Sequence, residues 1–258
     1  MKLTILGSGT SILTKKRSGP AYLLEIKNKK LLFDCGSSAF RSLVQANIDW
    51  SNIDYFFITH SHSDHLADLV PILQGIFVKM QFVSKEKRKK PNWLFGPPGF
   101  RKAYNQLTKI MFPEIKYFPI PIRIRELSNS SIRLNGFKIK TRLVTHVDEF
   151  FKSIAYRIEA EDKIFAYSGD TGICPGIKAI LKNADLSLVE ACQLVGHDEF
   201  NNHLSPRKAG ELAQKVGVKE LILTHLYDID SPQKVLASCK KEFKGRVILA
   251  KDFLKIKL

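Results

Sequence analysis

The feature that most constrains this chain is a dense cluster of metal-type ligands directly after a short apolar segment. Residues 55–58 read Tyr-Phe-Phe-Ile, which is typical of a buried strand, and residues 59–65 read Thr-His-Ser-His-Ser-Asp-His. Only seven histidines occur in the 258 residues, and three of them lie in this loop. Imidazole nitrogens combined with a carboxylate oxygen suit zinc, and less selectively manganese or iron. Because side chains of a turn point in several directions, this one loop can feed two adjacent ions.

Three further candidate ligands lie at the ends of other predicted strands. His146 follows the apolar segment 138–144 and His225 follows 221–223, each directly after a threonine, as His60 follows Thr59. Asp170 comes after the segment 164–167, within Ser-Gly-Asp-Thr. Strand ends that meet at one rim of a sheet are where α/β proteins build their sites. The predicted metal ligands are therefore His60, His62, Asp64, His65, His146, Asp170 and His225.

Apolar runs rich in Ile, Leu, Phe and Val alternate along the chain with turn residues and with helical spacing, which predicts sheets covered by helices. No Pro/Gly/Ser-rich linker divides the sequence, so one domain over residues 1–258 is expected, with a weak halving near residue 130. No run of about 18 apolar residues stands out, so no membrane-spanning helix and no membrane partner are expected. Cysteines at 35, 174, 192 and 239 lack C-x-x-C spacing, which predicts neither a disulfide framework nor a thiolate zinc site. The simplest interpretation is a reduced, cytoplasmic protein.

The chain is strongly basic. Lysine and arginine number 41 against 25 acidic residues, a formal net charge of +16. Two interpretations stay open: a surface for nucleic acid or another anionic substrate, or a lysine-rich sequence with no such role. The densest run, residues 85–90 (Lys-Glu-Lys-Arg-Lys-Lys), is either a solvated loop or a phosphate-binding patch.

These motifs resemble the metallo-β-lactamase superfamily, and within it the tRNase Z-like phosphodiesterases (ribonuclease Z). The H-x-H-x-D-H motif, the S-G-D-T segment and the L-T-H ending all match, and Asp34 in Phe-Asp-Cys-Gly looks like the aspartate that braces the metal loop from behind. The resemblance implies a four-layer αββα sandwich with two zinc ions, or manganese or iron, at one edge of the sheets. One ion would take His60, His62 and His146, and the other would take Asp64, His65 and His225. Asp170 would bridge the two ions together with a water or hydroxide.

The resemblance also implies a reaction, in which the bridging hydroxide attacks a phosphodiester. His203 would donate a proton to the leaving oxygen, and Glu190 would orient His203. Asp64 counts among the catalytic residues because its loss should abolish turnover. Lys15 and Arg17, in a segment similar to P-T-K-x-R-N, would grip a phosphate of the substrate. His197 matches no motif and is expected to be structural.

The substrate stays open at this point. Long-arm tRNase Z enzymes carry a protruding arm between the histidine and aspartate that match His146 and Asp170, whereas only 24 residues separate these two positions here. A 3′ tRNA-processing endoribonuclease acting on a tRNA precursor is the leading hypothesis, and a cyclic-nucleotide phosphodiesterase is an alternative. A hydrolase of an acyl substrate (lactone, thioester or β-lactam) would keep the metals, and a non-catalytic nucleic-acid-binding module would use only the charge. A homodimer is also expected, because dimers are common among similar proteins.

Overall fold

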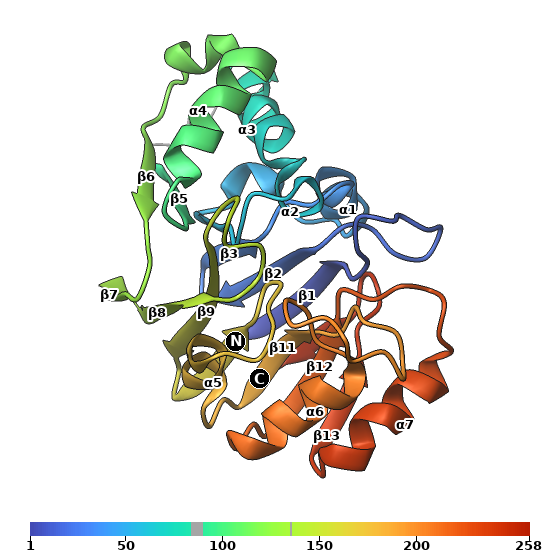
Figure 1. Cartoon of the computed structure of the whole chain (residues 1–258). Coiled ribbons are helices and arrows are strands. Elements are labelled where there is room, and N and C mark those ends of the chain that lie inside the picture. The colour runs from blue at the N-terminus through green and yellow to red at the C-terminus, as the bar shows by residue number, and fades with distance from the viewer. Residues whose placement is uncertain (84–89, 135) are drawn as a thin grey trace.

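The computed structural model describes residues 1–83, 90–134 and 136–258. Two seven-stranded mixed sheets pack face to face, and helices cover both outer faces (Figure 1). Helices α1 to α4 lie on one side of the pair of sheets, and helices α5 to α7 lie on the other. This arrangement confirms the expected αββα sandwich.

The first sheet carries the N-terminal part of the chain. Its strands, in pairing order, are β14 (Lys255–Lys257), β1 (Lys2–Gly7), β2 (Ala21–Ile26), β3 (Lys29–Phe33), β4 (Tyr55–Phe57), β5 (Asn92–Gly96) and β6 (Ile122–Glu126). Strands β3 to β6 run parallel to one another. Its helices are α1 (Ala39–Gln45), α2 (Ser63–Leu66), α3 (Leu69–Val78) and α4 (Phe100–Met111), with short helices η1 (Trp50–Asn52), η2 (Lys79–Val83) and η3 (Pro113–Tyr117).

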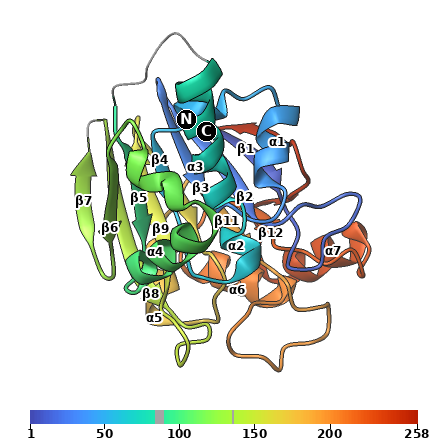
Figure 2. The ribbon, with the colours of Figure 1, turned by 90° about the horizontal axis from the view of Figure 1, so that it is seen from above.

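The second sheet follows after residue 130, close to the expected halving of the chain. Its strands, in pairing order, are β13 (Arg246–Leu249), β12 (Glu220–Thr224), β11 (Leu186–Glu190), β10 (Lys163–Tyr167), β9 (Ser153–Ala160), β8 (Phe137–Val144) and β7 (Ser131–Leu134). Helices α5 (Pro175–Leu181), α6 (Pro206–Lys215) and α7 (Pro232–Glu242) cover its outer face. Each of these helices begins with proline at its first turn, where a missing N–H costs nothing. Figure 2 shows the same layers from above.

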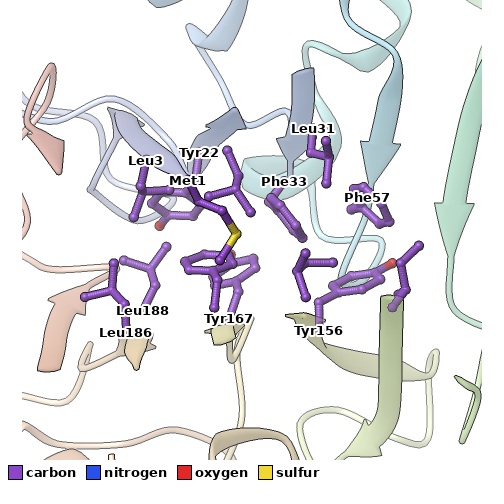
Figure 3. Packing of buried hydrophobic residues seen from close by; sticks show 14 of the residues in the cluster. Met1, Leu3, Tyr22, Leu31, Phe33, Phe57, Tyr156, Tyr167, Leu186 and Leu188 are labelled. Carbon is purple, nitrogen blue, oxygen red and sulfur yellow. The ribbon is translucent and has the colours of Figure 1, made fainter. Parts of the chain in front are cut away.

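The central core lies between the two sheets (Figure 3). Phe33 and Phe57 of the first sheet stack at 4.8 Å, and the ring of Tyr156 from the second sheet meets Phe33 edge-on at 5.8 Å. Burying each such ring contributes about 1.5–3 kcal/mol. The hydroxyl groups of this core point toward the sheet edge: Tyr167 donates to the carboxylate of Asp34 over 2.6 Å. The core therefore fixes the residues that stand behind the predicted metal loop.

One helical run differs from the sequence expectation about membranes. Residues Ser63–Val83 form a run that is long and apolar enough to cross a membrane, judged by length and composition alone. Its apolar face packs on the first sheet instead, with Leu69, Ile72 and Leu73 fully buried. Of its most apolar 18-residue window, 39% is buried, and the first turn of the run carries two predicted ligands, Asp64 and His65.

Several elements depart from the predicted ones. Strand β4 ends at Phe57, one residue before the end of the predicted strand 55–58, because residues 58–62 already turn toward the site. Strands β6, β7 and β14 were not predicted, since they lie at or near sheet edges and carry charged residues on their exposed positions. The predicted metal ligands nonetheless follow strands β4, β8, β10 and β12, at one edge of the sandwich.

Candidate metal centre

The ligand loop is held close to strand β3 by main-chain contacts. The amide of Cys35 donates to the carbonyl of His65 over 2.8 Å, and the amide of Asp68 donates to the carbonyl of Cys35 over 2.8 Å. A Cβ atom at Gly36 would lie 2.0 Å from the carbonyl oxygen of Asp64, so only glycine allows the loop to approach this closely. Asp34 itself has φ 52°, a left-handed conformation of the kind that occurs where function requires an exact backbone position.

Asp34 anchors two of the predicted ligands from behind. Its carboxylate accepts hydrogen bonds from the amide and hydroxyl of Thr59 (2.8 and 2.9 Å), from Nδ1 of His65 (2.8 Å) and from Tyr167. Because the Thr59 hydroxyl donates its proton to Asp34, it accepts from Nδ1 of His60 at 2.9 Å. A neutral imidazole that donates through Nδ1 carries a lone pair on Nε2. His60 and His65 therefore both turn an Nε2 lone pair inward.

His60, His62 and His146 converge on one point. The Nδ1 atom of His62 lies 3.0 Å from Nε2 of His60 and 3.1 Å from Nε2 of His146. His146 donates through Nδ1 to the carbonyl of Asn202 at 3.1 Å, so its Nε2 lone pair also faces inward. Burial and the neighbouring histidines lower the pKa values of His60 and His62, which favours their neutral, metal-binding forms.

A second group lies beside the first. The Nε2 atom of His225 lies 3.3 Å from the carboxylate of Asp64, and Nε2 of His65 lies 3.6 Å from it. Asp170 stands between the groups, with carboxylate oxygens 3.3 Å from Nε2 of His65 and 3.9 Å from Nε2 of His60. A Cβ atom at Gly169 would lie 2.8 Å from the Thr59 side chain, so the glycine lets Asp170 enter the site. The structure thus brings together all seven residues that were predicted as ligands.

Buried atoms in this cluster fit bound cations. Nε2 of His65 and Oδ1 of Asp170, which lie 3.3 Å apart, are buried without a hydrogen-bond partner. Burial opposes charge on both Asp170 and His65, yet the surrounding histidines lower the pKa of Asp170, and the carboxylates of Asp170 and Asp34 raise the pKa of His65. The carboxylates therefore attract positive charge to this cluster, which bound cations would supply. His60, His62, His146 and Asp170 form one group suited to a metal, and Asp64, His65 and His225 form another.

His203 and Glu190 adjoin this cluster. Glu190 is buried at the end of β11 and accepts a hydrogen bond from Nδ1 of His203 at 2.8 Å. Burial lowers the pKa of His203, but the charge and hydrogen bond of Glu190 outweigh it and raise the pKa to about 9. The ring of His203 lies 4.7 Å from the ring of His146. His203 is thus placed to hold a proton at the mouth of the site.

The loop at residues 14–17 was expected to grip a phosphate through Lys15 and Arg17, but Arg17 is already paired within the protein. The Arg17 guanidinium pairs with Asp228 at 2.7 Å and donates to Ser8 and to the carbonyl of Ala250, so a phosphate contact would have to displace these partners. Lys15 is exposed on the same loop. Residues 85–89 of the predicted phosphate patch lie outside the described residues. His197 is exposed and lies 3.4 Å from Glu199, away from the ligand cluster.

One residue near the site was missed as a candidate ligand. Cys192 was treated as an isolated cysteine, yet it lies in a group with Glu190, His203 and His225. The signal available in the sequence was its position two residues after Glu190, at the end of a predicted strand.

Comparison with known proteins gives the family. A family model described as anti-Pycsar protein Apyc1 matches residues 1–243. The chain belongs to the anti-Pycsar Apyc1 family. Ribonuclease Z of Archaeoglobus fulgidus is 24% identical over alignments that cover 100% of this chain and 97% of that protein. Ribonuclease Z of Mycobacterium bovis is also 24% identical, with coverage of 100% and 98%.

Solved structures share the fold of this Apyc1 family member. The metallo-β-lactamase fold protein YhfI from Bacillus subtilis has a TM-score of 0.83 at 22% identity, covering 99% of this chain and 98% of that one. The short form of human tRNase Z has a TM-score of 0.77 at 24% identity, covering 100% and 99%. The chain is therefore a metallo-hydrolase of the metallo-β-lactamase fold, similar to ribonuclease Z, with a buried histidine and aspartate cluster at its sheet edge.

Proposed function

We propose that this protein is a dinuclear metal-dependent phosphodiesterase that hydrolyses cyclic mononucleotides. The observation that carries the proposal is membership of the Apyc1 family over residues 1–243, in a chain whose histidine and aspartate side chains form groups suited to metal ions. Two zinc ions, or manganese or iron, bound there would supply an activated water and neutralise charge on the phosphate.

The chain's own residues divide the work. His60, His62 and His146 would hold one ion, Asp64, His65 and His225 would hold the other, and Asp170 would contact both. Asp34 positions His65 and, through Thr59, His60. His203 gives its proton to the leaving ribose oxygen, and Glu190 keeps that proton on the ring.

The shape of the chain favours a small substrate. The segment between His146 and Asp170, which carries the tRNA-binding arm in long-arm tRNase Z enzymes, is filled here mainly by the paired strands β9 and β10. A cyclic mononucleotide needs no such arm. The net charge of +16 would draw an anionic nucleotide toward the protein.

Exposed apolar side chains beside His146 offer a place for the base. Phe150 and Phe200 are 75% and 63% exposed, and Ile173 is 41% exposed. Their three loops are joined next to the site: the amide of Gly172 donates to the carbonyl of Thr145 over 2.8 Å, and His146 donates to the carbonyl of Asn202. Aromatic faces stack on nucleobases and tolerate different bases. A nucleotide whose phosphate lies between the metals would thus find a stacking surface on the His203 side.

The test is a direct comparison of substrates. The protein, loaded with two equivalents of zinc, is incubated separately with 3′,5′-cyclic purine and pyrimidine nucleotides, 3′-extended pre-tRNA, an acyl lactone and nitrocefin. We expect cyclic nucleotides to be opened to linear monophosphates, and chelator or Asp64→Ala to abolish this. Hydrolysis of the acyl substrates alone would refute the proposal.

Endoribonuclease activity on pre-tRNA is the second candidate, favoured by the full-length similarity to ribonuclease Z. Exposed Lys15 would then contact the RNA backbone. Specific cleavage of pre-tRNA at the 3′ end, with no turnover of cyclic nucleotides, would select this function.

A further inference from the structure

A second group of ligand atoms adjoins the seven-residue cluster. One ligand atom from each of Glu190, Cys192, His203 and His225 lies within 4.8 Å of the others. Glu190 and Cys192 are 1% and 7% exposed, so these two ligands are shielded from bulk water, whereas His203 is partly exposed. The proposed hydrolysis uses Glu190, His203 and His225 but has no role for the Cys192 thiol.

We propose that Glu190, Cys192 and His203 form a third, inhibitory site for a thiophilic divalent cation such as Zn²⁺ or Cd²⁺. His225 remains with the dinuclear set and forms one wall of this third site, with its ring stacked 6.2 Å from the ring of His203.

The spacing of the three ligands suits a single ion. Zinc–ligand bonds of about 2.0–2.3 Å in a tetrahedral site put neighbouring ligand atoms roughly 3.3–3.8 Å apart. Oε1 of Glu190 already lies 2.8 Å from Nδ1 of His203, and Sγ of Cys192 lies within 4.8 Å of a ligand atom of each of these two residues. One cation bound there would take the thiol, the carboxylate and the imidazole, with a fourth position left for water.

The Glu190 carboxylate attracts a cation to this group, and the Cys192 thiol must give up its proton when the cation binds. Burial raises the pKa of the Cys192 thiol, and the carboxylates of Glu190 and Asp170 raise it further, so the thiol keeps its proton until a cation replaces it. On binding, the thiol proton and the Nδ1 proton of His203 are released to solvent. One thiolate and one carboxylate then balance the two charges of the ion, which offsets its repulsion from the neighbouring metals.

Inhibition follows from the loss of one proton. With the ion between Glu190 and Nδ1, His203 can no longer exist as the imidazolium that gives a proton to the leaving oxygen. This consequence rests on the proposed function, whereas binding of the third ion does not.

The experiment uses the protein loaded with two equivalents of zinc. Cd²⁺ is added stepwise while the ultraviolet cadmium–thiolate absorption, the bound cadmium and the retained zinc are measured, and hydrolysis of the cyclic nucleotide is followed in parallel. We expect one further equivalent to bind with a thiolate band, without loss of zinc, and with inhibition.

Two variants and one control separate Cys192 from the other thiols. Cys192→Ser and Cys192→Thr should lose the band and weaken the added ion by about tenfold or more, because the softest ligand is gone. Each variant's inhibition is normalised to its own activity. Cys174→Ser changes another buried cysteine, outside the group, and should keep both the band and the inhibition.

Two results would overturn the proposal. The thiolate band could be absent at every cadmium concentration, or it could form with the first two equivalents added to metal-free protein, which would assign Cys192 to the dinuclear set. A band that forms only with the third equivalent supports the site even if no phosphodiester is hydrolysed, so failure of the proposed function is distinguishable.

Discussion

Glu190 accepts a hydrogen bond from Nδ1 of His203 across 2.8 Å, although an irregular loop separates these residues by 13 positions. The carboxylate is buried and the imidazole is partly exposed, so the pair presents a proton toward solvent and substrate while its negative charge stays inside. The fold determines this pairing, because Glu190 is the last residue of β11 and His203 lies two residues before Ser205, the N-cap of α6.

The Glu190–His203 pair predicts that turnover depends on pH. With a pKa of about 9, raised above the ordinary 6.5, His203 is protonated at neutral pH and loses its proton as the pH rises through about 9. Turnover should therefore fall on the alkaline side. Glu190→Gln removes the charge that raises this pKa, so the alkaline limb of the kcat profile should move to lower pH and kcat should fall about 10²-fold. An alkaline limb that stays in place in Glu190→Gln would show that His203 is not the titrating donor.

Substitution of Asp34 should lower metal affinity although all seven predicted ligands stay in the sequence. Asp34→Asn replaces one acceptor oxygen by a donor, so the hydrogen bonds from His65, Thr59 and Tyr167 cannot all persist. We expect metal affinity to fall about 10–100-fold, measured by competition with a chelator. The free energy of unfolding should fall by about 2–3 kcal/mol.

Asp54→Asn is the matched control for Asp34, because Asp34 directly follows β3 and Asp54 directly precedes the neighbouring strand β4, and the Asp54 carboxylate also accepts from a main-chain amide, that of Lys30, at 2.9 Å. It should leave metal affinity unchanged. Equal losses of affinity in the two variants would mean that the effect reports general destabilisation.

We expect Arg17 to have a structural role and Lys15 to have a role in substrate binding. Arg17→Ala breaks the ion pair with Asp228 and the hydrogen bonds to Ser8 and to the carbonyl of Ala250, so the free energy of unfolding should fall by about 1–3 kcal/mol. Lys15→Ala should leave stability unchanged and raise KM for the nucleotide at low salt. Thermal unfolding and initial rates distinguish these outcomes, and the reverse pattern would assign the phosphate contact to Arg17.

We expect the exposed ring of Phe200 to contribute to binding of the nucleobase. Phe200→Ala should raise KM for a cyclic nucleotide about tenfold, because base stacking on an aromatic ring contributes about 1–3 kcal/mol. Hydrolysis of bis(p-nitrophenyl) phosphate, which has no nucleobase, should change much less. Phe82→Ala, in η2, removes an equally exposed ring that lies outside the loops of the site and serves as the control.

Much of the site could be predicted from the sequence because its ligands stand at strand ends with short, local signals. The His60–His65 loop, Thr145-His146, Ser168-Gly169-Asp170 and Thr224-His225 each follow an apolar segment, and parallel strands bring such ends to one edge. The paired sheets and covering helices followed from the same alternation.

Long-range polar pairing could not be predicted. Arg17 and Asp228 are 211 positions apart, and nothing near either residue signals that the guanidinium is already paired. Cys192 shows the same limit, since its approach to His203 depends on how the loop after β11 folds back. Strands β6 and β14 could not be predicted from their own sequences, because they have little apolar content. Their pairing with β5 and β1 makes them strands.

The most direct test of the proposed metal centre is anomalous scattering at the zinc edge from crystals of the protein with two equivalents of zinc. We expect two peaks, one surrounded by His60, His62 and His146 and the other by Asp64, His65 and His225, with Asp170 contacting both. A single peak, or two peaks with His146, Asp170 or His225 turned away, would contradict this dinuclear site.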